Sequence, residues 1–211
     1  MLFFLTGEIQ TGKTRWLQAT IAELEQHGVQ VQGVIAPGVW REHRNPDDDN
    51  VSYEKLGIDN VLLPSGKRIT FARRVDLVDS ADWENECAQA KAAGLAWAIR
   101  DEAIAEVDAF FAHMNETRSC STARQASPAL RLVVIDEFGR LELLRNEGLV
   151  SAVELIDRGA TPAFPHALVI VREQLLDCAR ERFAHAPWNG MRPLHANDEG
   201  RNALFEAFGI F

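Results

Sequence analysis

The sequence predicts an α/β fold in three layers, with helices on both faces of a mostly parallel sheet and an antiparallel β-hairpin attached to that sheet. Two observations lead to this prediction. Apolar runs of strand length alternate along the chain with amphipathic stretches of helical length, and this alternation is typical of parallel sheets covered by helices. The turn-forming residues Pro64, Ser65 and Gly66 also separate two alternating apolar segments, which is the pattern of a hairpin.

Length and composition are those of one globular unit. The chain has 211 residues, of which 46% are hydrophobic and 25% are charged, so we expect one sizeable core. Residues 1–211 are therefore treated as a single domain, with a hairpin insertion at about 51–75 and a polar loop at about 118–129. The net charge of −9 disfavours a nucleic-acid partner, because proteins that bind phosphate backbones usually present a basic surface.

The first strand is expected at Leu2–Leu5, an apolar run that leads directly into a glycine-rich loop. The loop begins at Gly7 and has the pattern G-x-x-x-x-G-K-[ST], which binds phosphate groups when it lies between a strand and a helix. Gly7 and Gly12 carry no Cβ atom, so the backbone can turn its N–H groups inward around an anion. The predicted nucleotide-binding residues are Gly7, Glu8, Ile9, Gln10, Thr11, Gly12, Lys13, Thr14 and Arg15.

A helix is expected directly after this loop, because apolar residues recur at helical spacing from Trp16 to Leu24 and Gly28 ends the pattern. The positive end of the helix dipole would face the bound phosphates. Lys13 would contact the β- and γ-phosphates, and the Thr14 hydroxyl would bind Mg²⁺. The motif therefore predicts Mg²⁺ as the cofactor and a nucleoside triphosphate as the ligand.

The next elements follow from local pattern. A second strand is expected at Val31–Ala36, and an exposed loop from Val39 to Asn50. Residues 76–95 show no clean period and are interpreted as irregular, whereas Ala96–Met114 has the apolar face of a long helix. Beyond residue 148 we expect helices at 149–158, 173–183 and 200–208 and strands at 165–171 and 191–195.

A second motif lies at Leu130–Ile135, a β-branched run followed by Asp136 and Glu137. Buried parallel strands are nearly all apolar, and open α/β sheets bind ligands at the carboxyl ends of their strands. Asp136 would hold Mg²⁺ through water, and Glu137 would orient a water molecule for attack on the γ-phosphate. We expect the loop and this acidic pair to face each other across neighbouring strand tips. The predicted catalytic residues are Lys13 and Glu137, and the predicted metal ligands are Thr14 and Asp136.

Localisation is expected to be cytoplasmic, without membrane association. Cys87, Cys120 and Cys178 are widely spaced and have the pattern of neither a disulfide framework nor a zinc site. The apolar run Met1–Leu5 is too short for a signal sequence, and no apolar run approaches the length of a membrane span.

Three segments together resemble one family. They are the glycine-rich loop, the stretch Gly33–Pro37 followed by the pair Arg41–Glu42, and Ile135–Leu143. In these segments, and in Gly66–Ile69 of the hairpin, the chain is similar to the THEP-type nucleoside triphosphatases, which include the cancer-related nucleoside triphosphatase. The resemblance implies an additional-strand P-loop NTPase fold and Mg²⁺-dependent hydrolysis of nucleoside triphosphates with loose base preference.

An arginine usually neutralises the charge that develops on the γ-phosphate during hydrolysis. The candidates are Arg41, after the second strand, and Arg172, just past the strand expected at 165–171. For each of them a surface ion pair with a neighbouring glutamate is the alternative. Arg140 and Glu142 follow the acidic pair and are interpreted as scaffolding.

Two other functions share these motifs. A small-molecule kinase would use the same phosphate loop, with Arg68, Arg73 and Arg74 of the hairpin in a lid, although a solvated hairpin edge is the simpler interpretation of these arginines. A nucleotide-gated binding module would hydrolyse slowly and associate with another protein, for which the acidic surface and the polar stretch 118–127 leave room.

Overall fold

The computed structural model describes residues 1–8, 11–44, 51–81, 83, 87–95, 97–119 and 130–211, and excludes the side chains of Arg118, Ser119 and Glu137. The strands are β1 Leu2–Leu5, β2 Gln30–Ile35, β3 Gly38–Arg44, β4 Val51–Leu63, β5 Lys67–Arg74, β6 Trp97–Ile99, β7 Arg131–Phe138, β8 His166–Val171 and β9 Met191–Leu194. The α-helices are α1 Lys13–Gln26, α3 Ala88–Ala92, α4 Asp101–Ser119, α5 Val150–Asp157, α6 Leu176–Arg182 and α7 Asp198–Ala207, and the short turns are η1 Val75–Leu77, η2 Leu141–Arg145 and η3 Glu173–Leu175.

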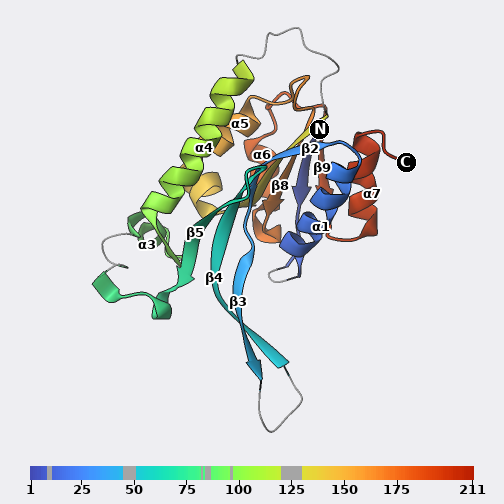
Figure 1. Cartoon of the computed structure of the whole chain (residues 1–211). Coiled ribbons are helices and arrows are strands. Elements are labelled where there is room, and N and C mark those ends of the chain that lie inside the picture. The colour runs from blue at the N-terminus through green and yellow to red at the C-terminus, as the bar shows by residue number, and fades with distance from the viewer. Residues whose placement is uncertain (9–10, 45–50, 82, 84–86, 96, 120–129) are drawn as a thin grey trace.

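All nine strands belong to one mixed sheet (Figure 1). Its order is β6-β5-β4-β2-β7-β8-β1-β9, and β3 pairs with β4 beside this path. Among the described strands, four pairings are parallel and four are antiparallel. The prediction of a mostly parallel sheet therefore holds only for the half from β2 to β9. In the other half the Pro64–Gly66 connection between β4 and β5 is too short for a parallel crossover.

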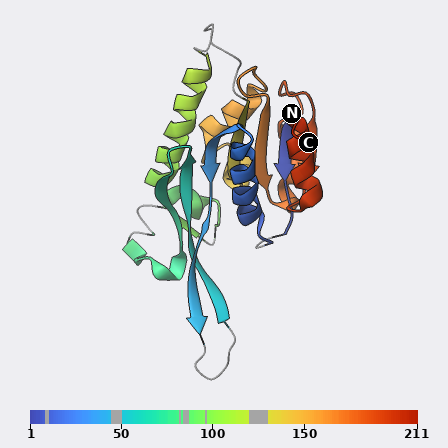
Figure 2. The same cartoon turned by 45° about the vertical axis from the view of Figure 1, so that its right-hand side comes forward.

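Helices cover both faces of the parallel half (Figures 1 and 2). Helices α4, α5 and α6 pack on one face in a cluster that includes Phe4 and Ile135. Helices α1 and α7 pack on the other face, which we call the α1 face, against Phe3 and Val134. Neighbouring residues of β1 and β7 thus point to opposite faces that are both buried, which explains why these strands are continuous apolar runs.

Strands β3 and β4 run together past the rest of the sheet as a two-stranded ribbon, at the bottom of Figure 1. The prediction of a loop at Val39–Asn50 is wrong for the first half of that segment, because Gly38–Arg44 is a strand. Residues 45–50 lie outside the described part of the chain. Residues 40–44 are all exposed. A strand without a buried face shows no apolar alternation, so the sequence pattern could not indicate it.

The hairpin of β4 and β5 forms as predicted, with Pro64–Gly66 at its turn. The helix expected from Ala96 begins only at Asp101, because Trp97–Ile99 forms the edge strand β6 on β5. Helix α3 lies within the segment interpreted as irregular. Of the polar loop predicted at about 118–129, the first two residues end α4 and residues 120–129 are not described. Within the described chain, none of the helices has the length and apolar character needed to cross a membrane.

His166, the first residue of β8, is a half-buried histidine at the amino edge of the sheet. Its Nε2 lies 2.9 Å from the carbonyl oxygen of Ala207 and its Nδ1 lies 3.1 Å from the Met1 amino group. Burial, assisted by the positive charge of that amino group, lowers the pKa of His166 to about 4. The imidazole is therefore neutral near pH 7, with Nε2–H donating to Ala207.

We predict that this histidine makes folding sensitive to mild acid. In the unfolded chain its pKa is about 6.5, so between about pH 6.5 and the folded value of about 4 the unfolded form binds more protons. The free energy of unfolding should therefore be highest above pH 6.5 and fall as the pH approaches 4. Urea unfolding of wild type and His166→Gln, with the exposed His195→Gln as control, measures this. Equal pH dependence in all three proteins would contradict it.

Candidate functional site

The glycine-rich loop lies between β1 and α1, where the sequence predicted it. Gly7 has a φ angle of 141° and Gly12 one of 85°, values that residues with a Cβ atom rarely adopt. These two angles explain why glycine stands at both positions. Ile9 and Gln10, which belong to the predicted phosphate-binding set, lie outside the described residues.

The Lys13 side chain folds back over this loop. Its Nζ donates hydrogen bonds to the carbonyl oxygen of Gly7, at 2.9 Å, and to that of Glu8. The Thr11 hydroxyl donates to the same Glu8 carbonyl at 2.9 Å. Hydrogen bonds from the side chains of Thr11 and Lys13 thus stabilise the loop, and the Lys13 ammonium group lies against the loop backbone.

The amino end of α1 adds to this positive potential. The helix begins at Lys13 with Gly12 as its N-cap, and Thr14 and Arg15 continue its first turn. Among the described residues no side chain caps the helix, and its first turn contains no acidic residue. The positive end of a 14-residue helix therefore meets the loop without a carboxylate from its own first turn, which is the electrostatic condition for binding an anion.

Strand β7 brings the predicted acidic pair to the sheet edge. Asp136 is only 5% exposed, and its Oδ2 accepts a hydrogen bond from the N–H of Ala36 at 2.8 Å. Ala36 directly follows β2, so this carboxylate joins the carboxyl ends of two neighbouring strands. Glu137 is the next residue of β7, and its side chain lies outside the described part of the structure.

One strand, β8, lies between β1 and β7. Two strand spacings, about 10 Å, therefore separate the strand before the loop from the strand that carries Asp136. The prediction that the loop and the acidic pair follow neighbouring strands is therefore wrong, because β8 lies between β1 and β7. The three strands are parallel, and Leu5 stands opposite Ile170 while Ile135 stands opposite Val169. The loop and Asp136 thus emerge at the same edge and at nearly the same height.

Thr14 and Asp136 form a donor set that suits Mg²⁺. This ion prefers oxygen ligands, takes only one or two of them from carboxylates, and completes its shell with water and substrate phosphates. Thr14 offers a hydroxyl group in the first turn of α1, and Asp136 offers a buried carboxylate. No group of three or more His, Cys, Asp or Glu side chains that could hold a metal exists among the described residues. A metal ion at this edge would therefore need ligands from water and from bound phosphate oxygens.

The two candidate arginines have very different surroundings. Arg172 directly follows β8, the strand between β1 and β7, and it is exposed. Arg41 lies on β3, where its Nη1 is 3.9 Å from Oε2 of Glu54. It is six residues past Ile35, the last residue of β2, which puts it about 20 Å along the chain from the end of that strand. Arg172 is therefore close to the sheet edge that bears the loop. Arg41 has a surface ion pair, as its alternative interpretation expected, but with Glu54 of β4 and not with the neighbouring Glu42.

Glu142 is a buried carboxylate that shapes the turn after β7. It lies in η2, a π-helical turn. Its Oε2 accepts a hydrogen bond from Gly139 N–H at 2.9 Å, and its Oε1 accepts one from Leu149 N–H at 3.1 Å. The interpretation of Glu142 as scaffolding is confirmed, because the carboxylate ties down the backbone that follows the acidic pair. Arg140 is exposed.

A cluster that the sequence did not reveal lies at the same edge, on β4 and β5. The Asp59 side chain is 11% exposed, and its Oδ1 is 3.1 Å from Nη1 of Arg73. Its Oδ2 is 3.3 Å from Nη1 of Arg68. The interpretation of these arginines as a solvated hairpin edge is therefore incomplete. Arg74, by contrast, pairs with Glu54 and Asp76.

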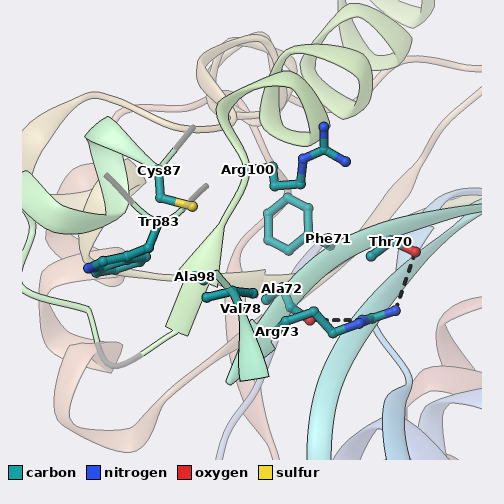
Figure 3. Close-up of a pocket in the computed structure, with 9 residues that line it drawn as sticks. All are labelled: Thr70, Phe71, Ala72, Arg73, Val78, Trp83, Cys87, Ala98 and Arg100. Carbon is teal, nitrogen blue, oxygen red and sulfur yellow. Dashed lines mark hydrogen bonds between the residues drawn. The ribbon is translucent and has the colours of Figure 1, made fainter. Parts of the chain in front are cut away.

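A cavity of about 220 Å³ lies beside this cluster, between β5, β6 and the segment before α3 (Figure 3). Phe71, Trp83 and Cys87 line it, together with Ala98. Figure 3 shows that Arg73, at its margin, turns its guanidinium toward Thr70. Neither Lys13 nor Asp136 lines this cavity, so it does not include the glycine-rich loop or the acidic pair.

No protein-family model, curated protein or solved structure matches this chain. The structure itself shows an α/β protein with a mixed nine-stranded sheet. At one edge of that sheet a glycine-rich loop with Lys13 and a buried aspartate, Asp136, stand one strand apart.

We predict that Glu142→Gln destabilises the protein by about 1–3 kcal/mol, because an amide accepts through only one of its two heavy atoms. Either Gly139 N–H or Leu149 N–H then loses a charged partner and faces an NH₂ group. Urea unfolding measures the loss.

The matched control is Glu147→Gln. Glu147 is more exposed and pairs with Arg145 at 2.8 Å, and such surface pairs contribute roughly 0–1 kcal/mol. If both variants unfolded at the same urea concentration as wild type, the two hydrogen bonds of Glu142 would contribute nothing to the stability of the fold.

Proposed function

We propose that this protein is an Mg²⁺-dependent nucleoside triphosphatase that cleaves nucleoside triphosphates to diphosphate and phosphate. The observation that carries the proposal is the shared edge of β1 and β7, with Lys13 after one strand and Asp136 at the end of the other. In an additional-strand P-loop fold, one strand separates these two, and β8 has that position. This arrangement supports the resemblance to the THEP-type nucleoside triphosphatases.

The loop would bind the triphosphate. The backbone N–H groups in the first turn of α1 and the positive end of that helix favour an anion here. The Lys13 ammonium, which lies against the carbonyls of Gly7 and Glu8, would exchange these neutral acceptors for charged phosphate oxygens. Hydrogen bonds to charged groups are the stronger ones, so the ligand can compete for the lysine.

Four side chains would act at the γ-phosphate. Thr14 and Asp136 would hold the Mg²⁺, whose contribution is to neutralise charge on the β- and γ-phosphates. Glu137 would orient and polarise the attacking water as a general base. Arg172 would offset the negative charge that develops during cleavage, since it follows the strand between the two halves of the site. We propose that the reaction takes place in the cytoplasm, where thiols such as that of Cys178 stay reduced.

Steady-state phosphate release tests the proposal directly. With ATP, GTP, CTP and UTP in turn, release should require Mg²⁺ and should stop when EDTA is added. A protein that releases no phosphate from any of the four nucleotides would rule the proposal out.

We predict that Lys13→Ala lowers phosphate release by at least about a hundredfold, because it removes a donor that neutralises charge in the transition state. The control is Lys91→Ala, on the exposed side of α3, which removes the same charge and should keep wild-type turnover. Thermal melting curves establish that both variants fold. An equal loss in the two variants would mean that the lysine acts through bulk charge only.

We also predict that Glu137→Gln keeps nucleotide affinity and loses about 10²–10⁴-fold in turnover, the range for removal of a general base. Fluorescent-nucleotide binding and phosphate release on the same preparation separate the two effects. Wild-type turnover in this variant would remove Glu137 from the mechanism and leave Lys13 and Asp136 untouched.

A further inference from the structure

The Asp59 cluster lies on the same face of the sheet as Asp136. Side chains alternate along a strand, and Val134 of β7 packs on the α1 face, so Asp136 belongs to that face as well. Val61 of β4 also packs there, and Arg68 stands opposite Val61 in the β4–β5 pairing. Opposite residues in an antiparallel pair share a face. Arg68 therefore extends from the α1 face, as does the proposed metal ligand.

Two consecutive backbone residues, Ala36 and Pro37, link this cluster to Asp136. The N–H of Ala36 donates to Asp136 at 2.8 Å, and the carbonyl oxygen of Pro37 accepts a hydrogen bond from the N–H of Asp59 at 3.1 Å. Strand β2 is the single strand between β7 and β4, so about 10 Å separates the two aspartates across the edge. A small molecule can span this distance.

The cluster carries one positive charge in excess, because two guanidinium groups share the single carboxylate of Asp59. Arg73 is fixed in place by the carbonyls of Ile58 and Ala72, at 3.4 and 2.9 Å, in addition to Asp59. A third type of contact, to the Thr70 hydroxyl at 3.3 Å, is drawn in Figure 3. Arg73 is therefore a rigid, oriented cation.

Arg68 is the accessible member of the pair. Its side chain is 60% exposed, and among the described residues its guanidinium makes one hydrogen bond, to Asp59. A guanidinium has five N–H donors in a planar fork that matches the oxygens of phosphates and carboxylates. Asp59 thus holds the Arg68 guanidinium near the sheet edge that bears Asp136, while most N–H donors of Arg68 stay available to a ligand.

We propose that Arg68 and Arg73, positioned by Asp59, form a second anion site that binds the phosphate or carboxylate group of a small molecule beside the γ-phosphate. Its place in the reaction rests on the function proposed above. The anion is either the phosphate that hydrolysis releases or the charged group of a molecule that accepts the γ-phosphoryl group. In the second case the acceptor oxygen bonds to the γ-phosphorus, the bond from that phosphorus to the β–γ bridging oxygen breaks, and the acceptor proton leaves to Glu137.

Titration of inorganic phosphate by calorimetry tests the site without any turnover. The protein is Lys13→Ala, in which the glycine-rich loop has lost its lysine. Adding Arg68→Gln should weaken phosphate binding roughly tenfold or more, as expected for the loss of charge-assisted hydrogen bonds. Lys67→Gln removes the same charge from the neighbouring residue, which pairs with Glu106 instead, and should keep the affinity within about twofold.

The outcomes separate this site from the proposed hydrolysis. Equal phosphate affinity in the two double variants, or no phosphate binding in Lys13→Ala, would overturn the anion site, whatever the wild-type protein does with ATP. Loss of binding only with Arg68→Gln supports it even in a protein that hydrolyses nothing.

Assays with γ-labelled ATP then identify the source of the anion. Inhibition by free phosphate that is relieved in Arg68→Gln assigns the site to the released product. Transfer of label to small phosphate- or carboxylate-bearing molecules, lost in Arg68→Gln and kept in Lys67→Gln, assigns it to an acceptor. If Arg68→Gln changes neither inhibition nor transfer relative to Lys67→Gln, the site has no place in the reaction.

Discussion

The hydrogen bond from Ala36 N–H to the buried carboxylate of Asp136 is the interaction on which the polar edge of this protein depends. It fastens the carboxyl end of β2 to that of β7, and the adjoining Pro37 carbonyl binds the N–H of Asp59 on β4. The parallel and antiparallel halves of the sheet share β2, and Ala36 and Pro37 extend the link between them just beyond that strand. A charged carboxylate without such donors would be costly in this dry position, so the bond also explains how an acidic group is kept at the end of an apolar strand.

Local patterns were sufficient for the parts of the fold that lie within one segment of chain. The glycine-rich loop is defined by eight consecutive residues, and the apolar runs that became β7 and β8 are buried on both faces, so their composition alone indicates strands. The turn at Pro64–Gly66 and the scaffolding function of Glu142 were also accessible from sequence. In each case the residues that determine the structure are close together along the chain.

Features that depend on distant partners were not accessible. Trp97–Ile99 became a strand only because the edge of β5 was free to pair with it, and an apolar triplet fits a helix equally well. The position of β8 between β1 and β7 is a property of the whole sheet. The convergence of Arg68 and Arg73 on Asp59 depends on the β4–β5 register, which includes an irregularity between Ile58 and Asp59. Sequence identifies such residues as polar and leaves their partners undetermined.

Burial of the parallel strands on both faces has a consequence for how this protein can diversify. All four residues of β1 are completely inaccessible to solvent, and those of β8 after His166 are nearly so. A polar replacement in these strands would therefore be strongly destabilising, whichever face of the sheet the side chain points to. Heritable change in chemistry is therefore confined to the segments that follow the strands. Homologues of this chain should keep apolar residues throughout the buried parallel strands and differ mainly in the few residues that follow each strand.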